Sequence, residues 1–393
     1  MNEQRLQHRI AEDGASEAES ATAERRLIQV VSGFRPDVDG MGDYARHLAE
    51  ELWRRHGIAS EMVVFHRPDN GAETGVGEGW RVRYAEAATG EALVAAVQER
   101  MREMPQAHLL LHYGPYAYTG NGRPLHFAEA MAKLGADGRL AVFFHEMWAR
   151  GWPWKRAFWT QGNQVRAVRA LIGASHVGFT SSELFRRWME PLNGRRTPLE
   201  QVRIFSNMGE VERPLPLRER EPRLVVFGQR ETRLRLYREY RRELEQLCRI
   251  LGLERIVDAG SGTAAIPERV GAIALERVGF LSEAEASRLL ATSVAGVVCY
   301  APVVWEKSGV LATYQAHGMV PVVAARWMQG FRATAETPFA LIGQLVRCAA
   351  MSADQMQALA DRAYVFYQRE VALRRAAEKV RGALWRGAAT AER

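Results

Sequence analysis

The stretch "AGVVCYAPVVWEKSGVLATYQAHGMVPVVAA" (Ala295–Ala325) decides the fold class of this chain. It opens with an apolar run, turns at a Glu-Lys-Ser-Gly corner, continues at helical spacing from Gly309 to His317, and closes with a second apolar run. Two strand-sized runs with a helix between them form a βαβ unit, and such units build parallel sheets that helices cover on both faces. The sequence therefore predicts an α/β protein.

The alternation of strands and helices extends over most of the chain. Strand-sized apolar runs occur in the first half, at residues 26–34, 61–66, 80–84, 107–114, 139–146 and 176–182. The stretch "GEVERPLPLREREP" (Gly209–Pro222) follows and has the proline-rich, non-periodic composition of an interdomain linker. Beyond it the alternation resumes, with strands predicted at 223–228, 255–260, 274–280, 295–300 and 319–325 and a long helix at 231–251.

These patterns predict two Rossmann-like, doubly wound α/β domains that face each other across a cleft. The expected division is a disordered tail at 1–25, an N-terminal domain at 26–210, a linker at 211–222, a C-terminal domain at 223–370 and a C-terminal helix at 371–393. That helix either crosses back to the first domain or forms an oligomer contact. Because ligands of open α/β sheets bind beyond the carboxyl ends of the strands, we expect the site in the cleft.

The composition narrows the functional class. Cys248, Cys299 and Cys348 lie far apart, which argues against a disulfide framework or a zinc site and is typical of a reducing cytoplasm. No apolar run reaches membrane-spanning length, and the first residues lack a signal-peptide core. The net charge of +7 favours phosphate-bearing ligands or an anionic membrane surface, whereas no nucleic-acid-binding motif is present. We expect a cytoplasmic protein, either free or in peripheral contact with the inner membrane face.

Two loops of the first half carry candidate residues. The loop "SGFRPDVDGMGDY" (Ser32–Tyr44) places Gly40 and Gly42 at the start of a helix, where the backbone can approach a ligand. An ordinary strand-to-helix turn also explains these glycines. The segment "FFHEMWARGWPWKRAFW" (Phe143–Trp159) places His145 at the end of an apolar strand, where its side chain can face the cleft.

Tryptophans crowd the segment after His145. Trp148, Trp152 and Trp154 are candidates for acceptor binding, because both sugars and lipids pack against the faces of aromatic rings. Together with neighbouring arginine and lysine they also have the composition of a membrane-interface segment. A half-buried aromatic cluster under a helix is the structural alternative.

The second half offers arginines after its first strand. In "FGQRETRLRLY" (Phe227–Tyr237), Arg230 and Arg233 could hold a diphosphate through bidentate hydrogen bonds. Arg230 is the strongest candidate, because it lies nearest the end of the strand. A solvated, arginine-rich helix face is the alternative.

The corner in the opening stretch combines an acid with an anion-binding geometry. Ser308 is a good N-cap, and Gly309 leaves the first-turn amides open to a phosphate. Glu306 can accept hydrogen bonds from sugar hydroxyls, and Lys307 adds positive charge. The alternative is a capped helix with a surface ion pair, which would explain Ser308 but not an acid beside an anion site. A ligand with a sugar joined to a phosphate would explain both.

The stretch "IVDAGSGTAA" (Ile256–Ala265) points to a different function. It resembles the first motif of S-adenosylmethionine-dependent methyltransferases. Those enzymes also place an acid at the end of the next strand, whereas Glu276 falls inside or before that strand. A methyltransferase is therefore a lesser alternative.

Several motifs, in order, resemble those of GT-B-fold glycosyltransferases, in particular the large retaining family that uses nucleotide-sugar donors (family 4-like, group 1). The resemblance covers most of Leu27–Ala325. "PDVDGMGDYARHLAEEL" looks like the N-terminal glycine loop and first helix of that family, "FHE" like its histidine motif and "VVFGQRETR" like its phosphate-binding strand. "VGFLSEAEASRLLATSVAGVVCYAP" and "EKSGVLATYQAHGMVPVV" look like the stretch leading to the donor site and the donor motif itself.

The resemblance implies a role for each candidate residue. Glu306 would hold the sugar hydroxyls near His145, and no metal or other cofactor would be needed. The nucleotide sugar would be a substrate, and the acceptor a saccharide, a lipid-linked molecule or a small molecule. The remaining assignments are Gly40, Gly42, Arg230, Arg233, Lys307, Ser308 and Gly309 to the donor phosphates or sugar, and Phe280, Leu281 and Thr313 to the nucleotide.

The chain departs from the family pattern at two places. The second glutamate of the family motif would fall at Thr313 or Tyr314, and Gln229 occupies the usual arginine position. The predicted function is a metal-independent, retaining glycosyltransferase. The departures leave open a GT-B scaffold without catalysis, acting as a binding or regulatory subunit.

Overall fold

The computed structural model describes residues 25–34, 40–66, 75–135, 137–194, 196–325 and 331–386. The predicted tail, apart from residue 25, and the end of the predicted C-terminal helix lie outside these residues. The chain divides into two compact units, with Met1–Val202 and Ala377–Arg393 in unit 1 and Arg203–Ala376 in unit 2.

Unit 1 is built on an eight-stranded sheet of order β3-β4-β2-β1-β5-β6-β7-β8, parallel except for the β3–β4 pair. Its strands are β1 (Arg26–Val31), β2 (Ala59–Val64), β3 (Val76–Gly77), β4 (Trp80–Tyr84), β5 (His108–Tyr113), β6 (Leu140–Phe144), β7 (Val177–Thr180) and β8 (Leu199–Gln201). The helices are α2 (Gly40–His56), α3 (Gly90–Glu103), α4 (Leu125–Leu134), α5 (Arg156–Ala174) and α6 (Glu183–Asn193).

Unit 2 contains a seven-stranded sheet of order β11-β12-β10-β9-β13-β14-β15, parallel except for the β11–β12 pair. Its strands are β9 (Glu221–Phe227), β10 (Arg255–Ala259), β11 (Arg269–Val270), β12 (Ile273–Gly279), β13 (Ser293–Cys299), β14 (Val320–Ala324) and β15 (Ala340–Leu341). Its helical segments are η1 (Leu217–Glu219), α7 (Arg230–Glu239), α8 (Arg241–Ile250), α9 (Glu283–Ala291), η2 (Pro302–Lys307), α10 (Gly309–Ala316), α11 (Ile342–Leu345) and α12 (Ala353–Glu370). Helix α13 (Leu373–Leu384) begins in unit 2 and continues into unit 1.

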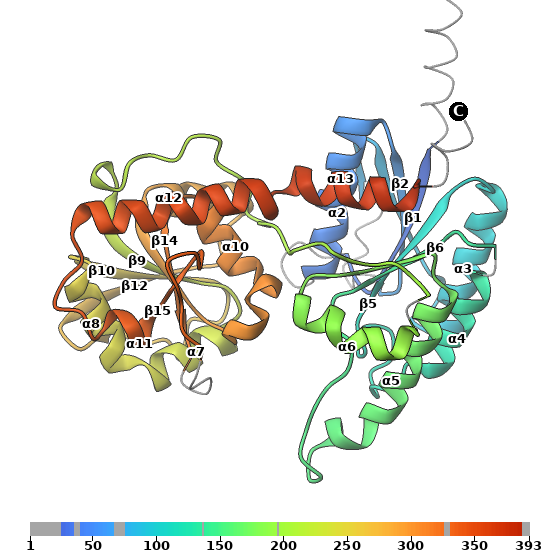
Figure 1. Ribbon diagram of the computed structural model, residues 1–393, viewed down its shortest axis with the longest axis horizontal. Helices are drawn as coiled ribbons and strands as arrows, with labels where there is room; N and C mark the ends of the chain where they lie inside the picture. The colour runs from blue at the N-terminus through green and yellow to red at the C-terminus, as the bar shows by residue number, and fades with distance from the viewer. Residues whose placement is uncertain are drawn as a thin grey trace, which may run out of the picture. The chain divides into compact units, whose positions relative to one another are not determined.

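Helices lie on both faces of each sheet (Figure 1). Strands covered in this way can be buried along their whole length, and every residue of β13 and β14 is buried. Strands buried on both faces are continuous apolar runs rather than alternating ones, which is why they were readable in the sequence. The predicted α/β class with two parallel-sheet units is confirmed.

Two predicted segments differ in detail. The proposed linker at 211–222 lies inside unit 2, because the buried Leu217 and Arg220 anchor it. The Arg220 guanidinium donates to the carbonyls of Ser293 and His317 at 3.2 and 3.0 Å. The helix predicted at 231–251 is two helices, α7 and α8, interrupted at Tyr240 (φ −123°, ψ 23°). Tyr240 is buried, and this turn carries no glycine or proline that could have predicted the break.

A chain of polar side chains crosses the core of unit 1. The amide nitrogen of Gln29 donates to Ala45 O and Ser60 Oγ, both at 3.3 Å, so its Oε1 is left to accept from His112 Nε2–H at 2.9 Å. With that proton on Nε2, neutral His112 offers the Nδ1 lone pair to His145 Nε2–H, also at 2.9 Å. Burial lowers the pKa of His112 to about 3, so this arrangement persists at neutral pH.

A buried ion pair connects elements across the core of unit 2. The Arg233 side chain is fully buried and pairs with Asp258, which also accepts a 2.8 Å hydrogen bond from the Tyr237 hydroxyl. The other Arg233 nitrogens donate to the carbonyls of Gly228, at 2.9 Å, and Ser261. One guanidinium thus joins α7, β10 and the loops that follow β9 and β10.

Removing the positive charge of this pair should be costly. Arg233→Met leaves a buried carboxylate without its partner, and we expect it to lower the free energy of unfolding by about 3–5 kcal/mol. Arg233→Met/Asp258→Asn, which keeps an acceptor for Tyr237, should recover much of that loss. Urea unfolding of both variants tests this, and a single-variant loss below about 1 kcal/mol would contradict the assigned role.

Acid should destabilise unit 1 through His112. The unfolded histidine takes up a proton near pH 6.5, whereas the native one resists protonation until about pH 3. Stability from this group is therefore complete above pH 6.5 and declines as the pH falls, by about 2 kcal/mol at pH 5. His112→Gln, which can still bond both neighbours, should flatten the dependence of unfolding free energy on pH. Equal slopes for the two proteins would refute the claim.

Candidate functional site

The strand order of unit 2 reverses between β9 and β13, which run parallel side by side. Loops that leave such a pair toward opposite faces open a crevice at the carboxyl edge of the sheet. Here the loop after β9 approaches the first turn of α10: a Cβ on Gly228 would lie 3.0 Å from Val310 Cγ2. Gly228 also has a φ of 118°, which an L side chain rarely adopts. The structure therefore places the beginnings of α7 and α10 side by side.

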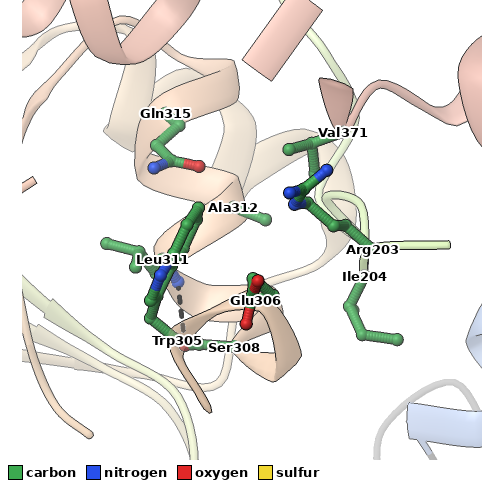
Figure 2. Close-up of a pocket in the computed structure, with 9 residues that line it drawn as sticks. All are labelled: Arg203, Ile204, Trp305, Glu306, Ser308, Leu311, Ala312, Gln315 and Val371. Atoms are coloured by element: carbon green, nitrogen blue, oxygen red, sulfur yellow. Dashed lines mark hydrogen bonds between the residues drawn. The ribbon is translucent and has the colours of Figure 1, made fainter. Parts of the chain in front are cut away.

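Ser308 organises the start of α10. Its Oγ accepts a 3.1 Å hydrogen bond from Leu311 N–H, and its own N–H donates to Trp305 O at 2.9 Å (Figure 2). The predicted N-cap is present, but the Ser308 N–H is occupied and is not open to a phosphate. Within the described residues no acceptor is found for the N–H groups of Gly309 and Val310. These two amides, rather than those of Ser308 and Gly309, are the donors that an anion at this helix end would meet.

Glu306 lies beside this corner in η2. Its main-chain carbonyl accepts a 3.2 Å hydrogen bond from Ile204 N–H, and its half-buried side chain lines a cavity together with Arg203 and Val371 (Figure 2). The cavity measures about 10 Å³, the space of roughly one water molecule. A nucleotide sugar cannot occupy it, so a donor would lie at the open edge of the sheet. Lys307, also half-buried, ends η2.

The two arginines predicted to bind the diphosphate have different environments. Arg230 is the first residue of α7, its side chain is 44% exposed, and it pairs with the exposed Glu231 at 3.0 Å. Exposure at the crevice leaves it able to turn toward a ligand. Arg233 is buried, and each of its three nitrogens already donates within the protein. The prediction that Arg233 contacts phosphate is therefore wrong, and its role is structural.

Thr313 cannot reach a ribose. It is buried, and its hydroxyl lies 3.1 Å from Ser206 Oγ. Tyr314, the other position considered for the second glutamate, is also buried. Its hydroxyl accepts from Phe227 N–H at 3.1 Å and lies 3.3 and 3.2 Å from the carbonyls of Val225 and Val297. The predicted nucleotide contact of Thr313 is thus excluded by burial, and neither position replaces the glutamate.

The remaining nucleotide candidates lie at the carboxyl end of β12. Phe280 is 59% exposed and Leu281 is half-buried, so a base could contact both. The "DAGSG" motif has a structural explanation. Asp258 pairs with Arg233, and a Cβ on Gly260 would lie 2.5 Å from Gly228 O. Close packing accounts for the motif that suggested a methyltransferase, so that alternative loses its support.

In unit 1 the predicted residues gather near the switch between β1 and β5. Gly40 begins α2 and is exposed, and among the described residues outside its own helical turn no atom lies within 4 Å of a Cβ placed there. Gly42 is required by packing, since a Cβ would lie 2.4 Å from Gly33 O. His145, 9% exposed, follows β6 and stacks on Phe143 at 4.3 Å. The loop residues 35–39 lie outside the described residues.

The three tryptophans predicted to bind acceptor separate into two groups. Trp148 is half-buried and stacks on Trp188 at 6.3 Å, so it belongs to the core and not to an acceptor platform. Trp152 and Trp154 are 68% and 73% exposed and stack face to face at 5.4 Å. Each therefore covers part of one face of the other, and their outer faces remain open.

Sequence reasoning missed His112 and Val310. A histidine inside the apolar run "HLLLHY" (His108–Tyr113) was a signal, because a buried polar side chain needs a partner. Nothing local marked Val310, whose first-turn N–H becomes important only once Ser308 N–H is seen to be bonded. Among the described residues, no group of three or more His, Cys, Asp or Glu could hold a metal ion.

A scan against protein-family models and a search of curated proteins both give no match. Among solved structures, the chain is similar to an α,α-trehalose 6-phosphate synthase from Burkholderia multivorans, with 14% identity, a TM-score of 0.57 and coverage of 93% of this chain and 100% of that one. An α-glucosyltransferase in complex with UDP matches at 9% identity and a TM-score of 0.56, over 92% of this chain and 99% of that one.

A trehalose-6-phosphate synthase used to study enzymatic glycosyl transfer with retention also matches. Its identity is 12% and its TM-score 0.60, over 92% of this chain and 99% of that one. At such identities the likeness concerns the fold. The GT-B fold predicted from the sequence is confirmed, and it is a fold on which glycosyl transfer takes place.

Proposed function

We propose that this chain is a glycosyltransferase that moves a sugar from a nucleotide-sugar donor to an acceptor hydroxyl with retention of configuration. The observation that carries the proposal is the crevice at the carboxyl edge of β9 and β13. There the N–H groups of Gly309 and Val310, the side chain of Arg230 and the carboxylate of Glu306 follow neighbouring strands. The fold shared with solved glycosyltransferases over more than nine-tenths of the chain supports it.

The chemistry follows from the charges. The leaving diphosphate gains negative charge as the glycosidic bond breaks, and preorganised donors stabilise it. The N-terminal amides of α10 and the Arg230 guanidinium would supply that stabilisation without requiring a metal ion. Glu306 would accept hydrogen bonds from the sugar hydroxyls and fix the ring. The acceptor hydroxyl then attacks the anomeric carbon, and its proton passes to a departing phosphate oxygen.

In unit 1, His145 is the residue that we assign to substrate contact. Its Nε2–H is committed to His112, so such a contact would involve another part of the ring. Gly40, whose exposed backbone carries no side chain, would let the donor or acceptor approach the start of α2. The nucleotide base would lie against Phe280 and Leu281.

A binding or regulatory subunit is the second candidate. The observation that favours it is the burial of Thr313 and Tyr314, which leaves the position of the family's second glutamate without a carboxylate. Such a protein would bind the nucleotide without turning over the donor. Binding and turnover are therefore measured separately.

Nucleoside diphosphates should bind and raise the melting temperature. We expect UDP, the nucleotide present in one structural neighbour, or another nucleoside diphosphate from a panel to stabilise the native protein in a thermal-shift assay. Arg230→Ala should weaken that ligand about tenfold or more, since a charge-assisted hydrogen bond is lost. Arg238→Ala, an exposed arginine further along α7, is the matched control and should bind normally. Equal weakening by both variants would remove Arg230 from the site.

Turnover should depend on Glu306. The wild-type protein is expected to release nucleoside diphosphate from a nucleotide sugar, and Glu306→Gln should reduce this release about 100-fold while UDP or the equivalent ligand still binds. Glu254→Gln, an exposed glutamate at the amino end of β10, controls for surface charge. Ligand binding with no release from any nucleotide sugar would identify the binding-subunit alternative instead.

A further inference from the structure

The segment before α5 and the first turns of that helix expose an unusual number of aromatic rings. Trp152, Trp154 and Trp159 are 68%, 73% and 70% exposed, and Phe158 is 43% exposed. In Figure 1 this part of the chain extends away from the rest of unit 1. Burying indole rings normally stabilises a protein, so rings left in water on a projecting segment indicate a partner.

Positive charge surrounds these rings. From Met147 to Ser182 the sequence contains no aspartate or glutamate. Lys155 and Arg156 are exposed between the tryptophans, and Arg166 and Arg169 continue along the exposed side of α5. We call Trp152, Trp154, Lys155, Arg156, Phe158 and Trp159 the aromatic-basic surface.

An open hollow of about 330 Å³ adjoins this surface. Arg123, Arg156 and Trp159 line it, together with Asn121 and Thr160. The Arg156 guanidinium donates to Asn121 O at 3.1 Å, which holds it at the wall of the hollow. Two guanidinium groups beside an indole make a site for a phosphate joined to an apolar body.

We propose that the aromatic-basic surface docks this protein on an anionic phospholipid bilayer, with lipid phosphates against Lys155, Arg156 and Arg123 and the indole rings at the headgroup level. Amphipathic indoles favour that depth, and arginine and lysine pair with anionic headgroups. None of the described helices is long and apolar enough to cross a membrane, so the contact is peripheral. This inference stands independently of the proposed glycosyl transfer.

Two observations favour a bilayer over a saccharide or a protein. A sugar-binding platform offers a ring face to the sugar, whereas Trp152 and Trp154 lie parallel at 5.4 Å and 3°, so the inner face of each ring is partly occupied by the other. The positive charge continues along α5 to Arg169 without an acid, and an extended surface of negative charge complements it better than a small patch.

Co-sedimentation of the full chain with vesicles tests the proposal. We expect binding at low salt to phosphatidylcholine vesicles that contain phosphatidylglycerol, and weak binding to phosphatidylcholine alone. Trp152→Ser/Trp154→Ser and Lys155→Glu/Arg156→Glu should each weaken partitioning by about tenfold or more, and high salt should affect the wild type more than the charge variant. Arg241→Glu/Arg242→Glu, which reverses two exposed arginines at the start of α8, is the matched control and should bind like the wild type.

Several results would overturn the proposal. Wild-type vesicle binding that is absent at low salt, or equal for anionic and neutral vesicles, would contradict it. Equal loss in the control would show a general charge effect. Binding of soluble oligosaccharides that depends on Trp152 and Trp154, without vesicle binding, would assign the surface to an acceptor. Self-association that disappears in the tryptophan variant would assign it to a second copy. Thermal unfolding and circular dichroism of each variant confirm that it is folded.

Discussion

The buried guanidinium of Arg233 is the interaction on which the candidate donor site depends. It holds Gly228 O in the loop after β9, Asp258 in β10 and Ser261 O in the loop after β10. That loop has to be fixed, because Gly228 packs against Val310 and Arg230 follows directly. Arg233, which the sequence suggested as a ligand-binding residue, thus fixes the loop that positions the exposed Arg230. Burying the charge is tolerable only because the pairing is complete.

The architecture was predictable from the sequence to the extent that it depends on local patterns. Strands such as β6 and β13 were visible because burial on both faces makes them apolar throughout. The Ser308 cap was visible because N-capping acts within one helical turn. The helix break at Tyr240 was not predictable, because no glycine or proline marks it. Tyr240 is buried, so the break depends on tertiary packing.

The candidate site was predictable in position and only partly in composition. Parallel-sheet topology places its residues after the strand ends. Arg230 and Gly309 begin the helices that follow the adjacent strands β9 and β13. Arg230 and Arg233 lie in the same helix and look equally suited to a phosphate in the sequence. Arg233 turns inward because it pairs with Asp258 on a different strand. The same limit applies to His145, whose partner His112 lies on the neighbouring strand. Such pairings follow from the fold and not from spacing.

Tyr314 shows why a family motif can lose a carboxylate while its scaffold persists. Its hydroxyl bonds main-chain groups of β9 and β13, the paired strands between which the strand order reverses, and its ring lies where a Cβ on Gly296 would be 2.5 Å away. A glutamate there would be shorter, charged and buried, and could not donate to those carbonyls. The tyrosine therefore stabilises the crevice at the expense of a ribose contact. Under the proposed function, donor affinity would then come mainly from the diphosphate and the sugar, to which the amides of Gly309 and Val310, Arg230 and Glu306 are assigned.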